Sequence, residues 1–409
     1  MWSSPRTVVL IALAAIPGAP LPQSTPEGAG QVWVERADGA SEWRTRAQLA
    51  DLERRPDGAL EAVALVFAAP ATVGASADLG DEALELDLVG GDRLAGRVDG
   101  GEGERLLFEL AAGPTLDLPV DALRRGLFPA RVPPGALATL VPADDADRLY
   151  LRVGERLDRV DGTLEGFAAE GMRFDGIAGR RTYPWAEIAA FYVAAVGSPP
   201  TPLAGQKDAV EVDLVGGARL SGRVLGLDAL TIELESHGTR LQLPLSAVAE
   251  VVTLDGRIMH LGALAPASIE GGRPFGDDLG MVFAPRADAA VHGGPLTTIH
   301  GPVARGYGVL APTRLEWQLD GTWERFACAV AVDASARRLG ASGSVRFAVE
   351  VDGKRVFESP VLTAADAPLD VPLVDLAGAT RLALIAEDGG DGFAGDRANW
   401  LRARIVRAQ

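Results

Sequence analysis

The alternation of apolar and polar side chains in the C-terminal part of the chain restricts its fold more than any other feature. Apolar side chains recur at every second position over residues 315–319, 326–332 and 345–351. A period of two buries one face of each strand in an antiparallel sheet. Asp352-Gly353 is then the pair preferred in a two-residue hairpin turn, which returns the chain into residues 355–358. This segment is therefore predicted to form an all-β sandwich.

An internal repeat fills the middle of the chain. The segment LDLVGGDRLAGRV at Leu86–Val98 recurs as VDLVGGARLSGRV at Val212–Val224, and a diverged copy lies between them at Gly162–Ile188. Each copy continues through short strands to a proline that precedes a turn and a last strand. Glycines within the copies permit the sharp bends that small barrels need. The repeat predicts three small barrels that resemble SH3-like or Sm-like barrels in architecture.

The N-terminus has the pattern of a secretory signal. A charged start at Arg6 precedes an apolar run at Thr7–Ile16, and Pro17–Pro20 breaks that run. The run is too short to span a bilayer comfortably. We expect a cleaved signal peptide and a mature chain without a membrane span, either secreted or located in the periplasm or cell envelope. An uncleaved signal anchor is the alternative.

The predicted fold class is all-β, with tandem small β-barrels followed by a jelly-roll β-sandwich. The expected boundaries are, in chain order, a signal peptide at 1–22, an N-terminal segment of unassigned fold at 23–80, barrel repeats at 81–130, 148–195 and 208–256, and the sandwich at 275–409.

The charge and the single cysteine exclude several classes of protein. The chain has 39 basic and 56 acidic residues, which give a net charge of −17. Nucleic acids and anionic membranes both require a cationic surface, so neither is an expected partner. One cysteine cannot form an intrachain disulfide, and Cys328 lies in an alternating strand, where it is interpreted as a small buried apolar residue.

The C-terminal motifs, taken in order, resemble the NPCBM/NEW2 domain, a family of carbohydrate-binding modules related to galactose-binding jelly rolls. The motifs are ARGYGVLAP, LDGTWERF, GSVRFAVEVDGK, LAGATRLALIAEDGGDG and DRANWLRARI, and the resemblance covers about residues 280–407. It implies a calcium-tolerant jelly roll with a shallow sugar site at one end and no catalysis by the module. Two segments depart from the pattern of the family. Gly308-Val309-Leu310-Ala311 stands where relatives tend to have Gly-Thr-His-Ala, and Asp396-Arg397-Ala398-Asn399-Trp400 stands where they tend to have Asp-His-Ala-Asp-Trp, so Leu310 and Arg397 each replace a histidine.

An acidic, glycine-rich loop at residues 387–396 is the first candidate site. Its Asp388, Asp391 and Asp396 are expected to bind sugar, and Asp388 and Asp391 are expected to bind calcium, since interspersed carboxylates and free carbonyls suit a hard cation. A solvated turn is the alternative. Asn399 and Trp400 follow the loop, and an exposed Trp400 would stack on a sugar ring, whereas a core position on the last strand is the alternative.

A second loop is placed near the ligand by the resemblance. Arg305 would donate hydrogen bonds to hydroxyl groups, Tyr307 would stack or hydrogen-bond, and Gly308 would let the backbone approach a sugar. The alternative is an ordinary entry into a strand.

No catalytic motif stands out. The four histidines show no ligand spacing, and neither a nucleophile elbow nor a phosphate-binding loop is present. Together with this absence, the resemblance implies an exported, non-catalytic protein whose partner is a glycan or polysaccharide, with calcium as the candidate cofactor. The alternative is a cell-envelope scaffolding protein whose sandwich contacts envelope proteins.

Overall fold

The computed structural model describes the chain over residues 31–36, 41–51, 60, 62–67, 79–111, 113–143, 145–194, 203, 205–215, 218–272, 282–339, 343–392 and 394–407. Strands dominate these ranges, and all of the helical turns within them are short 3₁₀ elements, which confirms the all-β prediction. No helix in these ranges is long and apolar enough to cross a membrane. The predicted signal peptide lies outside the described residues.

Three five-stranded antiparallel units occupy the middle of the chain. In each unit the first four strands pair in chain order, and the fifth strand pairs with the first. The first unit contains β4 (Leu84–Leu88), β5 (Arg93–Glu102), β6 (Arg105–Leu110), β7 (Thr115–Pro119) and β8 (Leu123–Leu127); the second contains β9 (Asp147–Val153), β10 (Arg156–Ala168), β11 (Gly171–Gly176), β12 (Gly179–Pro184) and β13 (Ile188–Tyr192); the third contains β14 (Ala209–Leu214), β15 (Arg219–Leu227), β16 (Thr231–Ser236), β17 (Thr239–Pro244) and β18 (Val248–Thr253).

The second strand of every unit bends at the same repeat position. β5, β10 and β15 each shift register immediately before a glycine, at Gly100, Gly166 and Gly226. Four residues earlier, a Cβ atom at Gly162 would lie 2.1 Å from the carbonyl oxygen of Asp175 on β11, so only glycine fits there. Each bulge lets a long strand curl around its own core. The assignment of these units to SH3-like or Sm-like barrels stays a prediction.

The N-terminal segment, to which the sequence assigns no fold, forms β1 (Gln31–Arg36), β2 (Ser41–Thr45) and β3 (Ala62–Phe67). β3 pairs with both β1 and β18, so this segment extends the sheet of the third unit. β8 pairs with β13 and joins the first unit to the second. One large cluster of buried side chains joins β1 and β3 to the three units.

The C-terminal part is a two-sheet sandwich. Its buried side chains, which include Trp317, Phe347 and Trp400, form a core of their own between the sheets. One sheet contains β19 (Ile258–His260), β21 (Arg286–Ala287), β24 (Gly306–Leu310), β26 (Arg325–Val332), β30 (Leu369–Asp370), β31 (Val374–Asp375) and β33 (Arg397–Val406); the other contains β20 (Ser268–Gly271), β25 (Thr313–Gln318), β27 (Ser344–Val351), β28 (Lys354–Glu358), β29 (Leu362–Thr363) and β32 (Arg381–Asp388); β22 (Leu296–Thr298) and β23 (Gly301–Val303) form a separate hairpin.

The 3₁₀ elements lie in connections between strands. They are η1 (Arg46–Asp51), η2 (Gly80–Glu82), η3 (Val120–Ala122), η4 (Pro129–Arg131), η5 (Leu137–Thr139), η6 (Trp185–Glu187), η7 (Leu261–Ala263) and η8 (Ala334–Leu339). η3 and η6 occupy the turn before the last strand of the first and second units, where the sequence shows a proline.

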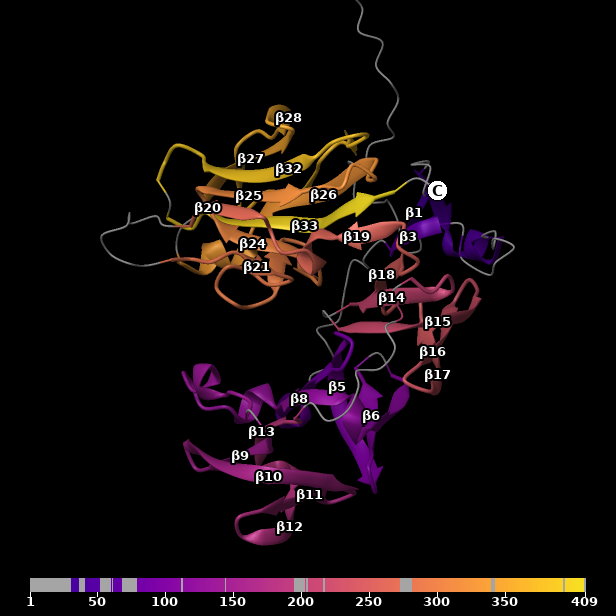
Figure 1. Ribbon diagram of the computed structural model, residues 1–409, viewed down its shortest axis with the longest axis vertical. Coiled ribbons are helices and arrows are strands. Elements are labelled where there is room, and N and C mark those ends of the chain that lie inside the picture. The colour runs from indigo at the N-terminus through magenta and orange to yellow at the C-terminus, as the bar shows by residue number, and fades with distance from the viewer. Residues whose placement is uncertain are drawn as a thin grey trace, which may run out of the picture.

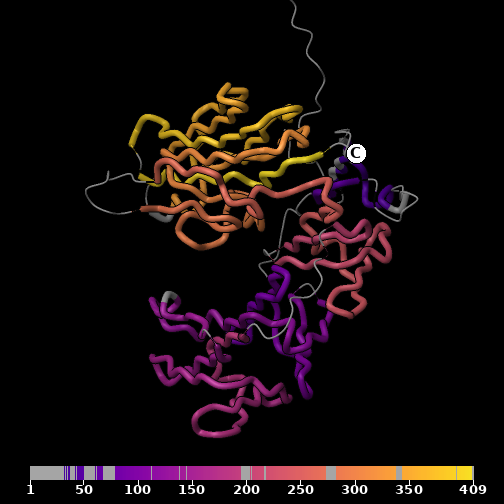
Figure 2. The backbone as a smooth tube through the Cα atoms, in the orientation of Figure 1, coloured from indigo at the N-terminus to yellow at the C-terminus, as the bar shows by residue number. Residues whose placement is uncertain are grey.

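The sandwich rests against the third unit and the N-terminal strands, and the first and second units lie on the far side of the third (Figures 1 and 2). Ile258 and Val406 of the sandwich sheet meet Ala64 of β3 and Val252 of β18 in a small apolar cluster. The sandwich is thus packed onto the preceding unit through buried side chains.

Candidate functional site

The acidic loop lies at one end of the sandwich, between the end of β32 and the start of β33. Asp388 and Asp391 are exposed there, whereas Asp396 is buried. Ser344, the first residue of β27, holds this loop in place. Its amide donates to Asp396 Oδ1 at 2.8 Å, and its hydroxyl donates to Asp391. The three predicted acids are thus brought together, and two of them face solvent.

Asp396 is a buried carboxylate with one unsatisfied oxygen. Its Oδ2 atom accepts no hydrogen bond. Burial, followed by the charges of Asp388 and Asp391, raises the pKa of Asp396 to about 6. A cation would satisfy that oxygen, but the part of the chain that the structure describes has no group of three His, Cys, Asp or Glu side chains that could hold a metal ion. Backbone carbonyls and water would have to complete a calcium shell around Asp388 and Asp391.

Trp400 and Asn399 lie inside the sandwich. Trp400 is 0 % exposed, and its ring packs edge-to-face on Phe347 with the centroids 5.2 Å apart. Asn399 Nδ2 donates to Asp333 Oδ2 at 2.7 Å. Neither side chain reaches a surface where a sugar could bind, so the stacking role expected for Trp400 is corrected to a core position. Both faces of β33 are covered, which explains the burial of both residues.

Arg305 and Tyr307 lie away from the acidic loop. Across the β24–β33 pair, Leu310 is opposite Arg397 and Gly306 is opposite Leu401, which places Arg305 roughly 15 Å along the sheet from the loop. Tyr307 is buried, and its hydroxyl donates to the carbonyl of Leu264 at 3.1 Å. The structure therefore does not bring the two predicted loops into one site.

Gly308 admits a neighbouring stretch of the same chain. A Cβ atom at this position would lie 2.4 Å from the carbonyl oxygen of Ala289 and 2.6 Å from the Cα atom of Ala290. The close approach predicted for this glycine is real, but residues 289–291 occupy the space. The expectation that a sugar approaches the backbone here is corrected accordingly.

Arg305 belongs to a buried ionic junction between the sandwich and the third unit. Its guanidinium pairs with Asp213 and Glu211 of β14. Arg219 of β15 also pairs with Asp213, at 3.0 Å, and reaches across to Asp288 of the sandwich at 2.9 Å. The ligand contact expected of Arg305 is therefore replaced by an interdomain contact.

The internal repeat contains an acid–base pair that could have indicated this junction. Asp213 and Arg219 occupy the same repeat positions as Asp87 and Arg93 of the first unit. The side chains of Asp87 and Arg93 are 34 % and 57 % exposed, whereas those of Asp213 and Arg219 are 3 % and 11 % exposed. The repeated acid–base pair is thus buried only in the copy that the sandwich covers.

A second buried acid, Asp333, also organises the loop end of the sandwich. It accepts hydrogen bonds from the Thr297 amide at 2.9 Å and from the Ser335 amide at 2.9 Å, in addition to the one from Asn399. Arg397 Nη1 donates to the Ser335 hydroxyl at 2.8 Å. These contacts fix the hairpin of β22 and β23, η8 and the start of β33 beside the acidic loop.

A two-sheet jelly-roll-like sandwich with ordered loops at one end belongs to the architecture of carbohydrate-binding modules. Residues 277–406, about a third of the chain, match the NPCBM/NEW2 domain family and form a domain of that family. The resemblance seen in the sequence is therefore confirmed. No curated protein matches the chain.

Three solved structures illustrate the similarity. The CBM51 of Clostridium perfringens GH95 in complex with methyl-galactose has 25 % identity and a TM-score of 0.32, with 36 % of this chain and 99 % of that one covered. The CBM51-2 and INT domains of Clostridium perfringens ZmpB, in complex with GlcNAc, have 19 % identity and a TM-score of 0.32, with 48 % and 40 % covered. The tandem CBM51 modules of the Streptococcus pneumoniae family 98 glycoside hydrolase Sp3GH98 have 15 % identity and a TM-score of 0.32, with 64 % and 88 % covered. This chain thus spans nearly all of the first structure but only about two fifths of the second.

Proposed function

We propose that this chain is an exported protein that recognises a glycan through its C-terminal sandwich and performs no chemistry on it. The observation that carries the proposal is the NPCBM/NEW2 domain at residues 277–406. The signal-like N-terminus supports export to the cell envelope or beyond.

The acidic loop is the surface that we propose for the glycan. Asp388 and Asp391 are exposed and anchored, and ionised carboxylates accept strong hydrogen bonds from hydroxyl groups. Of the residues proposed from the sequence, these two are the ones with side chains available to a ligand, because Arg305, Tyr307, Asp396, Asn399 and Trp400 are buried. Calcium at Asp388 and Asp391 is part of the proposal, with backbone carbonyls and water as the other ligands.

Calorimetric titration of the secreted chain with galactose and N-acetylglucosamine, with calcium and with EDTA, tests this function. Asp388→Asn and Asp391→Asn are each expected to remove the saturable heat of the sandwich site while leaving the fold intact, because each keeps the shape of the side chain and removes its charge. Asp320→Asn is the matched control, since Asp320 is an exposed turn residue at the opposite end of the sandwich. A folded chain with no saturable heat for either sugar, or equal heat in all three variants, would contradict the proposal.

The second candidate is a scaffolding role in which the sandwich contacts envelope proteins. It is favoured by Leu310 and Arg397, which replace the histidines of the family pattern, because Leu310 is buried and Arg397 is bonded to Ser335. Retention of envelope proteins by the immobilised chain, unchanged by Asp391→Asn and by competing sugar, would support this role over glycan binding.

A further inference from the structure

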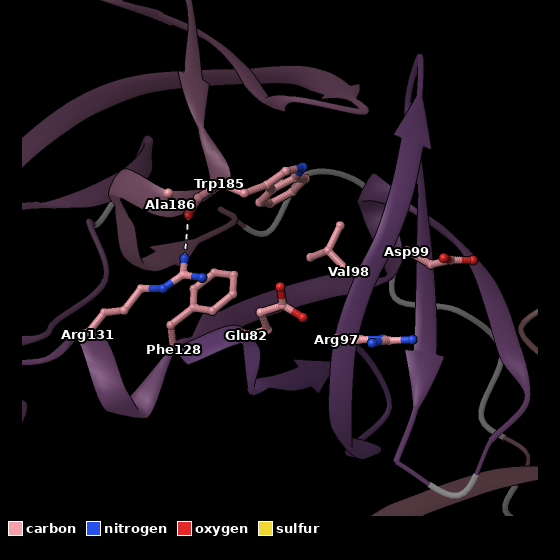
Figure 3. Close-up of a pocket in the computed structure, with 8 residues that line it drawn as sticks. All are labelled: Glu82, Arg97, Val98, Asp99, Phe128, Arg131, Trp185 and Ala186. Atoms are coloured by element: carbon pink, nitrogen blue, oxygen red, sulfur yellow. Dashed lines mark hydrogen bonds between the residues drawn. The ribbon is translucent and has the colours of Figure 1, made fainter. Parts of the chain in front are cut away.

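A cavity of about 350 Å³ opens between the first and second five-stranded units. Its lining includes Glu82, Val98 and Phe128 of the first unit and its flanks, Arg131 of η4, and Trp185 of the second unit (Figure 3). This volume lies at the low end of the range for small-molecule sites, which suits a ligand of one or two rings.

Trp185 forms an aromatic wall of this cavity. One face of its indole stacks on Phe167, with the centroids 6.1 Å apart and the rings 13° from parallel, and its Nε1 donates to the carbonyl of Ala168 at 3.3 Å. The side chain is only half-buried, and it lies beside Val98 at the cavity (Figure 3). The indole is thus held rigidly, with apolar surface turned to the cavity.

The tryptophan is specific to the second unit. The corresponding positions after the closing proline are Val120 in the first unit and Leu245 in the third. Leu245 is fully buried, so an aliphatic side chain serves the packing of the turn without an indole. The larger, half-exposed ring of Trp185 is therefore not required by the fold of the unit.

Two groups of opposite charge complete the cavity. The exposed Glu82 carboxylate points between Phe128 and Val98 and makes no hydrogen bond to another described residue. Arg131 is 9 % exposed, and its guanidinium lies 3.8 Å from the centroid of the Phe128 ring and donates to the backbone carbonyls of Asp81 and Ile188 at 2.9 Å and 3.0 Å. It has no carboxylate within ion-pair distance among the described residues, and its Nη2 atom donates to none of them.

These groups match a neutral polyhydroxy ring better than an ion. Glu82 would repel an anion, and Arg131 would repel a cation. A pyranose would place its C–H face on the indole, donate hydroxyl protons to Glu82 and accept from Arg131. We propose that the cavity beside Trp185 is a second sugar site, which binds one or two rings of a glycan independently of the sandwich.

The full chain labelled with 5-fluorotryptophan provides a local test. Each tryptophan gives one fluorine resonance, and the one lost in Trp185→Leu reports on the cavity. Galactose, N-acetylglucosamine or lactose is expected to shift that resonance saturably. Trp185→Leu, which imitates the third unit, and Glu82→Gln are each expected to weaken this binding about tenfold.

The sandwich variant Asp391→Asn separates this inference from the proposed function. The sandwich site and the site beside Trp185 share only the assumption that the ligand is a sugar. Asp391→Asn should therefore leave the shift of the Trp185 resonance unchanged. Trp185→Leu should likewise leave the heat of sugar binding to the sandwich unchanged. A Trp185 resonance that none of the three sugars moves, or one that moves equally in Glu82→Gln, would overturn the second site. With both sites working, one glycan bridging them would gain avidity.

Discussion

The Arg305 guanidinium of the sandwich and the Asp213 carboxylate of the third unit form an ion pair, with 2.5 Å between Nε and Oδ2, whose side chains are only 6 % and 3 % exposed. The two residues are 92 positions apart in the sequence. The pair and its neighbours Glu211, Arg219 and Asp288 lie at the surface where the sandwich rests on the repeat units. Charge removal on one side would leave an uncompensated buried charge on the other.

Arg305→Met is therefore expected to lower the free energy of unfolding by about 3 kcal/mol, because Asp213 and Glu211 would share Arg219 alone. Urea denaturation measures this loss. The double variant Arg305→Met/Asp213→Asn should regain part of it, since one acid and one base are then removed together and the net charge of the junction returns to its original value. Arg346→Met, which removes an exposed pair with Glu358, serves as the control and should cause no measurable change. Equal stability of Arg305→Met and the control would show that the junction contributes nothing.

Asp396 is expected to make the sandwich less stable as the pH rises. Its pKa is raised from 3.8 to about 6 by burial and by Asp388 and Asp391, so between these values the folded state binds more protons than the unfolded state. The contribution is thus complete below about pH 4 and is lost through pH 6, with a size of roughly 3 kcal/mol. Asp396→Asn imitates the neutral acid, and its unfolding free energy should lack this slope. If the original protein and Asp396→Asn show the same pH dependence of the unfolding free energy, that dependence comes from other groups.

Gly162→Ala is expected to destabilise the second unit by about 2 kcal/mol, because the new methyl group would lie 2.1 Å from a backbone oxygen that cannot move away. Gly226→Ala provides the comparison, since the nearest atom to its Cβ would be a side-chain oxygen at 3.4 Å. Thermal unfolding of the two variants measures the difference. Equal melting temperatures would mean that the paired strands β10 and β11 move apart to admit the methyl group more easily than the geometry indicates.

Trp400→Phe is expected to leave sugar binding by the sandwich unchanged and to cost about 1–3 kcal/mol of stability, because the indole fills core volume beside Phe347. Glycan titration at a temperature where the variant remains folded separates the two effects. Loss of binding by a folded Trp400→Phe protein would return Trp400 to the ligand site.

Trp400 also shows where pattern reasoning stops. Alternation identified its strand, but in β33 residues on both faces are buried: Trp400 and Ile405 lie in the main core, and Leu401 packs with Ala290 and Leu296. When both faces of a strand are covered, a period of two no longer separates inner from outer side chains. The sequence therefore did not decide whether Trp400 lies in the core or faces a ligand. The register of β33 within the sheet decided it.

The sequence by itself determined the strands, their turns and the repeated glycines, because these depend on contacts between near neighbours: Asp352-Gly353 closes its hairpin, and Gly162 meets the adjacent strand of its own unit. Only the tertiary structure decided which polar residues remain available to a ligand. Arg305 is buried by Asp213, Gly308 by residues 289–291, and Asp391 is left exposed beside Ser344. Burial depends on which distant segments pack against a side chain, and no local pattern records that packing.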